Sequence, residues 1–139
     1  MTAKEYLGQI KNIDHKLENL ANDAAYWRSV ASSPASKRLD AVRVQSSPNP
    51  DKMADAVAKA IEYSEEAETL YLEGMMLKKT VLDQLNGMED VKLSTVLRLI
   101  YLEDKSTYQI AKMMCYDPRY AKKLSKKAHL EFERQYLDT

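Results

Sequence analysis

Apolar residues recur at alternating spacings of three and four through residues 2–31. The positions are Ala3, Tyr6, Ile10, Ile13, Leu17, Leu20, Ala24, Trp27 and Ala31. This spacing predicts a long helix with one narrow apolar stripe, sustained over about four heptads. Two interpretations remain open, a helix packed within its own domain or a coiled coil within one chain or between two chains. In the second case the expected oligomerisation residues are Tyr6, Ile10, Ile13, Leu17, Leu20, Ala24 and Trp27.

The chain then passes through a segment that is rich in proline and serine. Ser32–Pro50 holds three of the four prolines, so residues 32–49 are expected to form a linker loop. The sequence AVRVQ within it is too short to support a sheet. Asn49 and Pro50 suit the N-cap and the first turn of a new helix.

A second long helix is predicted from Pro50 to about Leu85, within a segment assigned to residues 50–87. Its expected apolar stripe is Val57, Ile61, Ser64, Tyr71, Met75, Leu82 and Leu85, interrupted by Glu68 and Lys78. Asn86-Gly87 is expected to end the helix, with glycine in the left-handed conformation. Two long helices joined by a loop predict an antiparallel hairpin, which is interpreted as the oligomerisation or interaction region.

Residues 90–139 have a different pattern of shorter helices. Asp90 is expected to cap a helix over 91–102 that faces inward with Leu93, Val96, Leu97, Ile100 and Tyr101. Ser106 and Gln109 form a capping box, and its short helix faces inward with Ile110, Ala111 and Met114. Asp117 and Pro118 begin another helix at once, with Ala121, Leu124, Ala128 and Phe132 inward. Two helices joined by so short a turn predict a helix-turn-helix, with Cys115 where glycine often provides positive φ.

Charge is segregated along the chain although the net charge is zero. Residues 1–90 hold 11 Lys and Arg against 15 Asp and Glu, whereas residues 91–139 hold 10 against 6. A lysine-rich helix face is most often simply solvated. Here the cations lie on the predicted second helix of the helix-turn-helix, which favours binding of double-stranded DNA.

The expected DNA-binding residues fall into two groups. The first lies on the reading helix, over 118–136, and comprises Arg119, Tyr120, Lys122, Lys123, Lys126 and Lys127. Arginine can bond two atoms of a guanine edge, so Arg119 is the expected base contact and the lysines are expected on phosphates. The second group, Lys105, Ser106, Thr107 and Tyr108, is expected to bind a backbone phosphate at a helix start.

The remaining chemistry-bearing residues do not form a recognisable catalytic set. His15 and His129 lack a second ligand at metal-binding spacing, Cys115 has no partner motif, and no phosphate-binding glycine loop is present. We therefore expect a non-enzyme without metal or cofactor. The single cysteine, the absence of a long apolar run and the N-terminal sequence favour a cytoplasmic protein that makes no membrane contact.

The stretch LRLIYLEDKSTYQIAKMMCYDPRYAKKLSKKAHLEF resembles region 4 of bacterial sigma factors. It is more similar to the helix-turn-helix of small phage and prophage proteins that act as late transcription or autolysin regulators. Their pattern appears here as Tyr101, Lys105-Ser106, Ile110-Ala111, Cys115-Tyr116-Asp117 and Arg119–Lys127. KEYLGQIKNID and VQSSPNPDKMADAVAKAI also resemble an uncharacterised phage family of this type. The resemblance implies a phage-encoded DNA-binding regulator that acts with host RNA polymerase in a bacterial cell.

Three hypotheses follow for the function. The first is a sequence-specific transcription regulator that forms a homodimer or higher homo-oligomer through its long helices. The second is a DNA-recognition subunit of phage packaging, similar to a small terminase. The third is a coiled-coil interaction protein that binds a host factor. The sequence predicts an all-α fold in each case, with the helical hairpin followed by a three-helix, sigma region 4-like helix-turn-helix.

Overall fold

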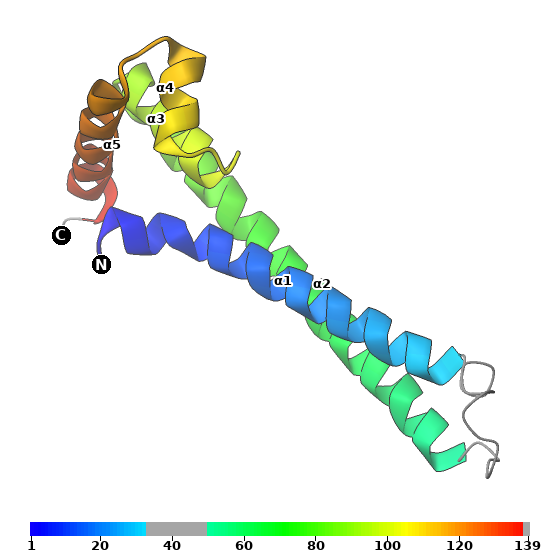
Figure 1. Ribbon diagram of the computed structural model, residues 1–139. Coiled ribbons are helices and arrows are strands. Elements are labelled where there is room, and N and C mark those ends of the chain that lie inside the picture. Colours follow the sequence, from blue (N-terminus) through cyan, green and yellow to red (C-terminus); the bar gives the residue numbers. More distant parts are fainter. Residues whose placement is uncertain (33–49, 138–139) are drawn as a thin grey trace. The chain divides into compact units, whose positions relative to one another are not determined.

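The computed structural model describes residues 1–32 and 50–137, and every element assigned within them is helical. In chain order these are α1 (Ala3–Ser32), α2 (Pro50–Asn86), α3 (Val91–Tyr101), α4 (Thr107–Met114), α5 (Pro118–Phe132) and a π-helical turn, η2 (Glu133–Leu137) (Figure 1). The predicted all-α class is confirmed, and the first three helices lie within one residue of their expected bounds. The expectations for residues 33–49, including AVRVQ and the Asn49 cap, lie outside the described residues.

The chain divides into two compact units. The first combines Met1–Asp14 with Glu73–Thr139, and the second is His15–Leu72. These divisions differ from the boundaries expected from the sequence, which separated the long helices from residues 90–139. Both long helices contribute to both units, because the first turns of α1 and the last turns of α2 share a core with the shorter helices.

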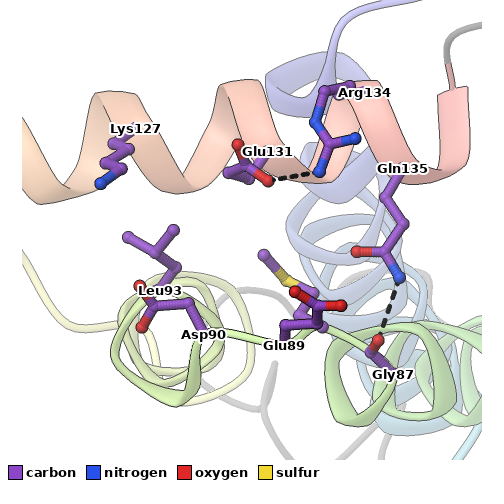
Figure 2. Close-up of a pocket in the computed structure, with 9 residues that line it drawn as sticks. Gly87, Glu89, Asp90, Leu93, Lys127, Glu131, Arg134 and Gln135 are labelled. Atoms are coloured by element: carbon purple, nitrogen blue, oxygen red, sulfur yellow. Dashed lines mark hydrogen bonds and ion pairs between the residues drawn. The ribbon is translucent and has the colours of Figure 1, made fainter.

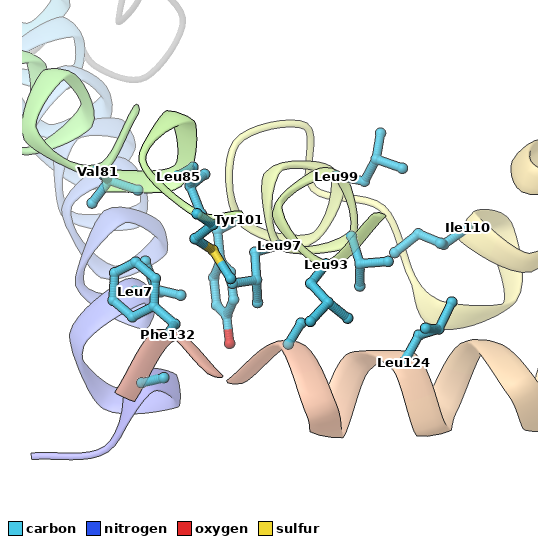
Figure 3. Packing of buried hydrophobic residues seen from close by; sticks show 14 of the residues in the cluster. Leu7, Val81, Leu85, Leu93, Leu97, Leu99, Tyr101, Ile110, Leu124 and Phe132 are labelled. Carbon is cyan, nitrogen blue, oxygen red and sulfur yellow. The ribbon is translucent and has the colours of Figure 1, made fainter. Parts of the chain in front are cut away.

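That core fills the first unit (Figure 3). Its fully covered side chains come from α1, α2, α3, α4 and α5 and include Leu7, Val81, Leu97, Ile110 and Phe132, each at most 1% exposed. Removing such side chains from water is the main favourable term in folding. The inward positions expected on α3, α4 and α5 are confirmed as buried or half-buried, and Leu99 joins them.

The beginning of α1 is tied to the first unit by polar as well as apolar contacts. The Tyr6 hydroxyl donates to Gln84 Oε1 at 2.9 Å, and the Ala3 N–H donates to Glu133 Oε1 at 2.7 Å. The Tyr6 ring also stacks on Phe132, with 5.8 Å between centroids. Lys78 Nζ lies 3.3 Å from Asp14 Oδ1, so residues later in α1 contact residues earlier in α2. The two helix segments are therefore antiparallel within this unit.

The second unit pairs the remainder of α1 with the first part of α2. Arg28 Nη2 donates to Ser64 Oγ at 3.2 Å, and Lys59 Nζ lies 4.3 Å from the centre of the Trp27 ring. Its buried side chains are small: Ala24, Ala56 and Ala60, which are 3%, 0% and 6% exposed. Large side chains of this unit, such as Trp27, Tyr63 and Leu70, are only half-buried, so the fully covered positions among its described residues are all alanine.

The stripe expected on α2 is wrong in most of its positions. Val57, Ile61, Tyr71 and Met75 are between 47% and 53% exposed. The covered series is instead Met53, Ala56, Ala60, Tyr63, Ala67 and Leu70 in the second unit, then Gly74, Leu77 and Val81 in the first. This series keeps the 3/4 spacing without a break, but alanine and glycine supply many of its members.

The α1 stripe is correct as a packing face. All nine of its positions are buried or half-buried, including the seven expected at an interface between copies. Leu7, outside the expected stripe, is fully buried as well. Because these side chains are covered within one chain, a dimer built on them would have to replace contacts that the chain already makes.

Gly87 ends α2 for a reason that differs from the expected one. None of the described glycines has positive φ, so Gly87 is not a left-handed cap. A Cβ at this position would lie 2.5 Å from the Tyr136 hydroxyl oxygen. That hydroxyl donates to the Gln84 carbonyl at 2.5 Å, and Gln135 Nε2 donates to the Gly87 carbonyl at 3.0 Å. The absence of a Cβ at Gly87 leaves room for the Tyr136 hydroxyl, which η2 brings against the end of α2.

Candidate nucleic-acid interface

The start of α4 is fixed by the expected capping box. The Gln109 N–H donates to Ser106 Oγ at 3.2 Å, and the Ser106 N–H donates to Gln109 Oε1 at 2.9 Å. Each side chain satisfies a backbone donor that the helix would otherwise leave unbonded. On the other face of α4, Ile110 and Ala111 are 1% and 2% exposed, which fixes its rotation against the core.

A three-residue turn, Cys115–Asp117, joins α4 to α5. Cys115 has φ 60° and ψ 42°, the left-handed conformation that the sequence placed there. The Tyr116 N–H donates to the Ala111 carbonyl at 2.8 Å, which closes the end of α4. Asp117 Oδ1 then accepts from the Arg119 N–H at 2.8 Å, and Pro118 occupies the first turn of α5. The predicted caps on both sides of the turn are confirmed.

The basic side chains of α5 are all exposed. They are Arg119, Lys122, Lys123, Lys126 and Lys127, opposite the buried residues Ala121, Leu124, Ala128 and Phe132. Because the buried set fixes the rotation of the helix, the cations are presented together to solvent. Tyr120 is 43% exposed, and its ring packs edge-on against Tyr116 with 4.9 Å between centroids. This contact restrains Tyr120 beside the basic residues.

A hydrogen-bonded pair joins α5 to α3 on the buried side. His129 Nδ1 lies 2.6 Å from the Ser125 carbonyl oxygen, which can only accept, so Nδ1 carries the proton. In the neutral ring His129 Nε2 then accepts from the Tyr101 hydroxyl, at 2.7 Å. Burial raises the pKa of the Tyr101 hydroxyl, which therefore remains the donor. The pair fixes α5 against the core without using an exposed cation.

The second group of expected DNA-binding residues, at positions 105–108, is less uniformly exposed than the group on α5. Lys105 and Thr107 are half-buried, whereas Ser106 and Tyr108 are exposed. The Ser106 N–H donates to Gln109 Oε1, so it is not free to donate to another acceptor. The capping box leaves the N–H groups of Thr107 and Tyr108 unused. Lys112, which the sequence did not assign to the site, holds its Nζ 5.4 Å from the centre of the Tyr108 ring.

The C-terminal end of the basic face meets a recess of about 460 Å³ that is lined by side chains of both charges (Figure 2). Lys127 and Arg134 line it with Glu89, Asp90 and Glu131. Glu131 Oε2 lies 2.8 Å from Arg134 Nη2, and this hydrogen bond, with the positive charges of Arg134 and Lys127, lowers the pKa of the Glu131 carboxyl. The positive charge of Lys127 thus acts on Glu131, whereas Arg119, Lys122, Lys123 and Lys126 do not line the recess.

The turn before α4 contains a feature that the sequence analysis missed. Asp104 has φ 53°, and its Oδ1 lies 3.1 Å from Lys11 Nζ. Aspartate tolerates the left-handed region better than most residues, which is the only local signal for this turn. The ion pair connects the turn to α1 within the first unit.

Comparison with known proteins found no family model, no curated protein and no solved structure that matches this chain. Within residues 1–32 and 50–137, no helix is long and apolar enough to cross a membrane. Over the same ranges, no group of three or more His, Cys, Asp or Glu side chains is arranged to hold a metal ion.

Proposed function

We propose that this chain is a sequence-specific DNA-binding regulator of transcription of the phage type. The observation that carries the proposal is the exposed basic face of α5, held by a buried apolar face on the same helix. The capped α4, the three-residue turn and α5 support a helix-turn-helix in which α5 enters the major groove. Arg119 is the proposed base contact, and Lys122, Lys123 and Lys126 bind phosphates.

The N-terminal caps of α4 and α5 decide which groups of these helices can contact DNA. The Asp117 carboxylate caps α5, so the positive end of that helix already faces a negative charge. Phosphate binding therefore depends on the side chains of α5 and on the Thr107 and Tyr108 amides of α4. The antiparallel pairing of α1 with α2 supports a helical hairpin beside this motif. Action with host RNA polymerase belongs to the same proposal through the resemblance to phage regulators. Homodimerisation through the long helices belongs to it through the spacing of their apolar residues, and would have to replace contacts that cover the α1 stripe within one chain.

Charge reversal on α5 tests the proposal. Lys122→Glu, Lys123→Glu and Lys126→Glu together should abolish retardation of promoter fragments from the source genome, because three phosphate contacts become repulsive. The matched control is Lys4→Glu, Lys16→Glu and Lys52→Glu, which changes the net charge equally at three exposed lysines outside α5. This control should retain most of the affinity.

The proposal fails if the α5 variant, with unchanged helical circular dichroism, still binds DNA like the parent chain. Equal losses in both triple variants would show that only net charge matters, and would remove α5 as the reading helix. Sequencing of the fragments retained by the parent chain then separates regulation from packaging, since promoters support the first and a packaging start supports the second.

A further inference from the structure

A second surface, on the second unit, has the features of a protein-docking site. We define the α2 stripe as Val57, Ile61, Ser64, Glu68 and Tyr71, which follow one another at spacings of 4, 3, 4 and 3. Its three large apolar side chains are 47%, 53% and 52% exposed, and Leu72 beside them is 58% exposed. The α2 residues that face α1 are a separate series with the same period, Met53, Ala56, Ala60, Tyr63, Ala67 and Leu70.

The spacing of the α2 stripe selects the shape of its occupant. A period of 3.5 residues is the pattern of helix-on-helix packing, in which side chains of one helix fit between those of the other. From Val57 to Tyr71 the stripe rises by about 21 Å, which matches a partner helix of about four turns. At the side of the stripe, Arg28 of α1 donates to Ser64 at 3.2 Å, so α1 borders the surface there.

Charge around the α2 stripe selects the chemistry of the occupant. Arg28 of α1 borders the stripe at Ser64. At about 100° per residue, Glu68 lies within the stripe and Glu65 lies beside it, whereas Glu62 and Glu66 lie on other faces of α2. The exposed carboxylates next to the apolar side chains are therefore Glu65 and Glu68. A helix with basic residues beside its apolar positions would pair with them, whereas an acidic helix or a nucleic acid would be repelled. We infer that the α2 stripe docks a basic amphipathic helix of a partner protein.

A second copy of this chain is a poorer occupant. Two α2 stripes in contact would bring glutamates from both copies together, which costs free energy. The basic helix of a second copy is α5, whose exposed apolar side chains, Tyr120 and Leu130, are separated on the outer face by Lys123 and Lys127. Its other large apolar side chains, Leu124 and Phe132, are 8% and 0% exposed in their own core. It therefore cannot present a continuous apolar stripe to α2 without unfolding.

A designed peptide tests the inference directly. The probe is a 21-residue labelled helix with leucine at heptad positions a and d and lysine at the flanking positions, and its twin carries glutamate in place of lysine. Fluorescence anisotropy with the full chain should show binding of the lysine peptide only. The double variant Ile61→Ser with Tyr71→Ser should weaken this binding at least about tenfold, since central apolar anchors dominate such interfaces.

Matched controls distinguish binding at the α2 stripe from nonspecific binding to other exposed apolar side chains. Leu130→Ser removes an apolar side chain that is 65% exposed on α5, and should leave peptide binding unchanged. Glu65→Gln with Glu68→Gln should weaken binding, whereas Glu18→Gln on α1 should not. DNA retardation should be normal in all of these variants, so failure here is distinguishable from failure of the proposed function.

Three results would overturn the inference. Equal binding of both peptides would show that the surface does not select a basic helix. Unchanged affinity in the Ile61/Tyr71 double variant would show that the peptide does not bind at the α2 stripe. The third is a concentration-dependent mass in sedimentation that the double variant abolishes, because it would assign the α2 stripe to a second copy of this chain.

Discussion

Cys115 shows how a single residue sets the geometry of the proposed DNA-binding unit. It holds φ 60° at the point where α4 ends, and Asp117 starts α5 two residues later. Any side chain with a Cβ is strained in this conformation, by something like 1 kcal/mol. The strain is sustained because the bond from the Tyr116 N–H to the Ala111 carbonyl and the Asp117 cap fix the backbone on both sides.

Cys115→Gly should therefore raise the free energy of unfolding by about 1 kcal/mol, since glycine adopts this conformation without the steric penalty. Cys115→Ala is the matched control, because it removes the thiol but keeps the Cβ, and it should lie within about 0.5 kcal/mol of the parent. Urea unfolding followed by circular dichroism measures both. If Cys115→Ala raised the free energy of unfolding as much as Cys115→Gly, removal of the thiol rather than relief of backbone strain would explain the stabilisation.

These residue-scale features could be predicted from the sequence because they are local. The Ser106/Gln109 box and the Asp117-Pro118 start each depend on residues within one helical turn, and the structure has both. The Gly87 cap was predicted incorrectly for the opposite reason. The close contact at Gly87 comes from the Tyr136 hydroxyl, and Tyr136 is distant in sequence and close only in the folded chain.

At the scale of the element, α2 carries two apolar series of the same period. The large series, which includes Val57 and Ile61, is exposed, and the small series, which includes Ala56 and Ala60, is covered. A prediction that weighs side-chain size assigns the core to the large series. Which of the two series faces α1 is decided by the pair of helices, so the pattern of α2 alone does not show it.

Two alanines two positions apart test this assignment. Ala60→Leu should lower the stability of the second unit by about 1–3 kcal/mol, because three more heavy atoms must fit where a methyl group is buried. Ala58→Leu, at an exposed position of the same helix, should change it by no more than about 0.5 kcal/mol. Trp27, the only tryptophan, lies in this unit and reports its unfolding by fluorescence. Equal effects at the two positions would contradict the assignment.

At the scale of the whole molecule, the division of the chain was the hardest feature to predict. Leu7 is fully buried in the core of the first unit, although it lies outside the regular α1 stripe. Sequence periodicity follows one helix at a time, so it could not show that the first turns of α1 pack beside α5. The exposed cations of α5 were predicted well, because the buried residues of the same helix fix their direction.

We propose that three lysines of α5 neutralise phosphates of a DNA duplex. Each such contact releases counterions, so the logarithm of the binding constant should fall with the logarithm of salt concentration at a slope of about −0.9 per contact. The slope can be measured for the parent chain on a retained genomic fragment. Phosphate contacts by Lys122, Lys123 and Lys126 give an expected slope of about −3, and a slope near zero would show that these lysines neutralise no phosphate.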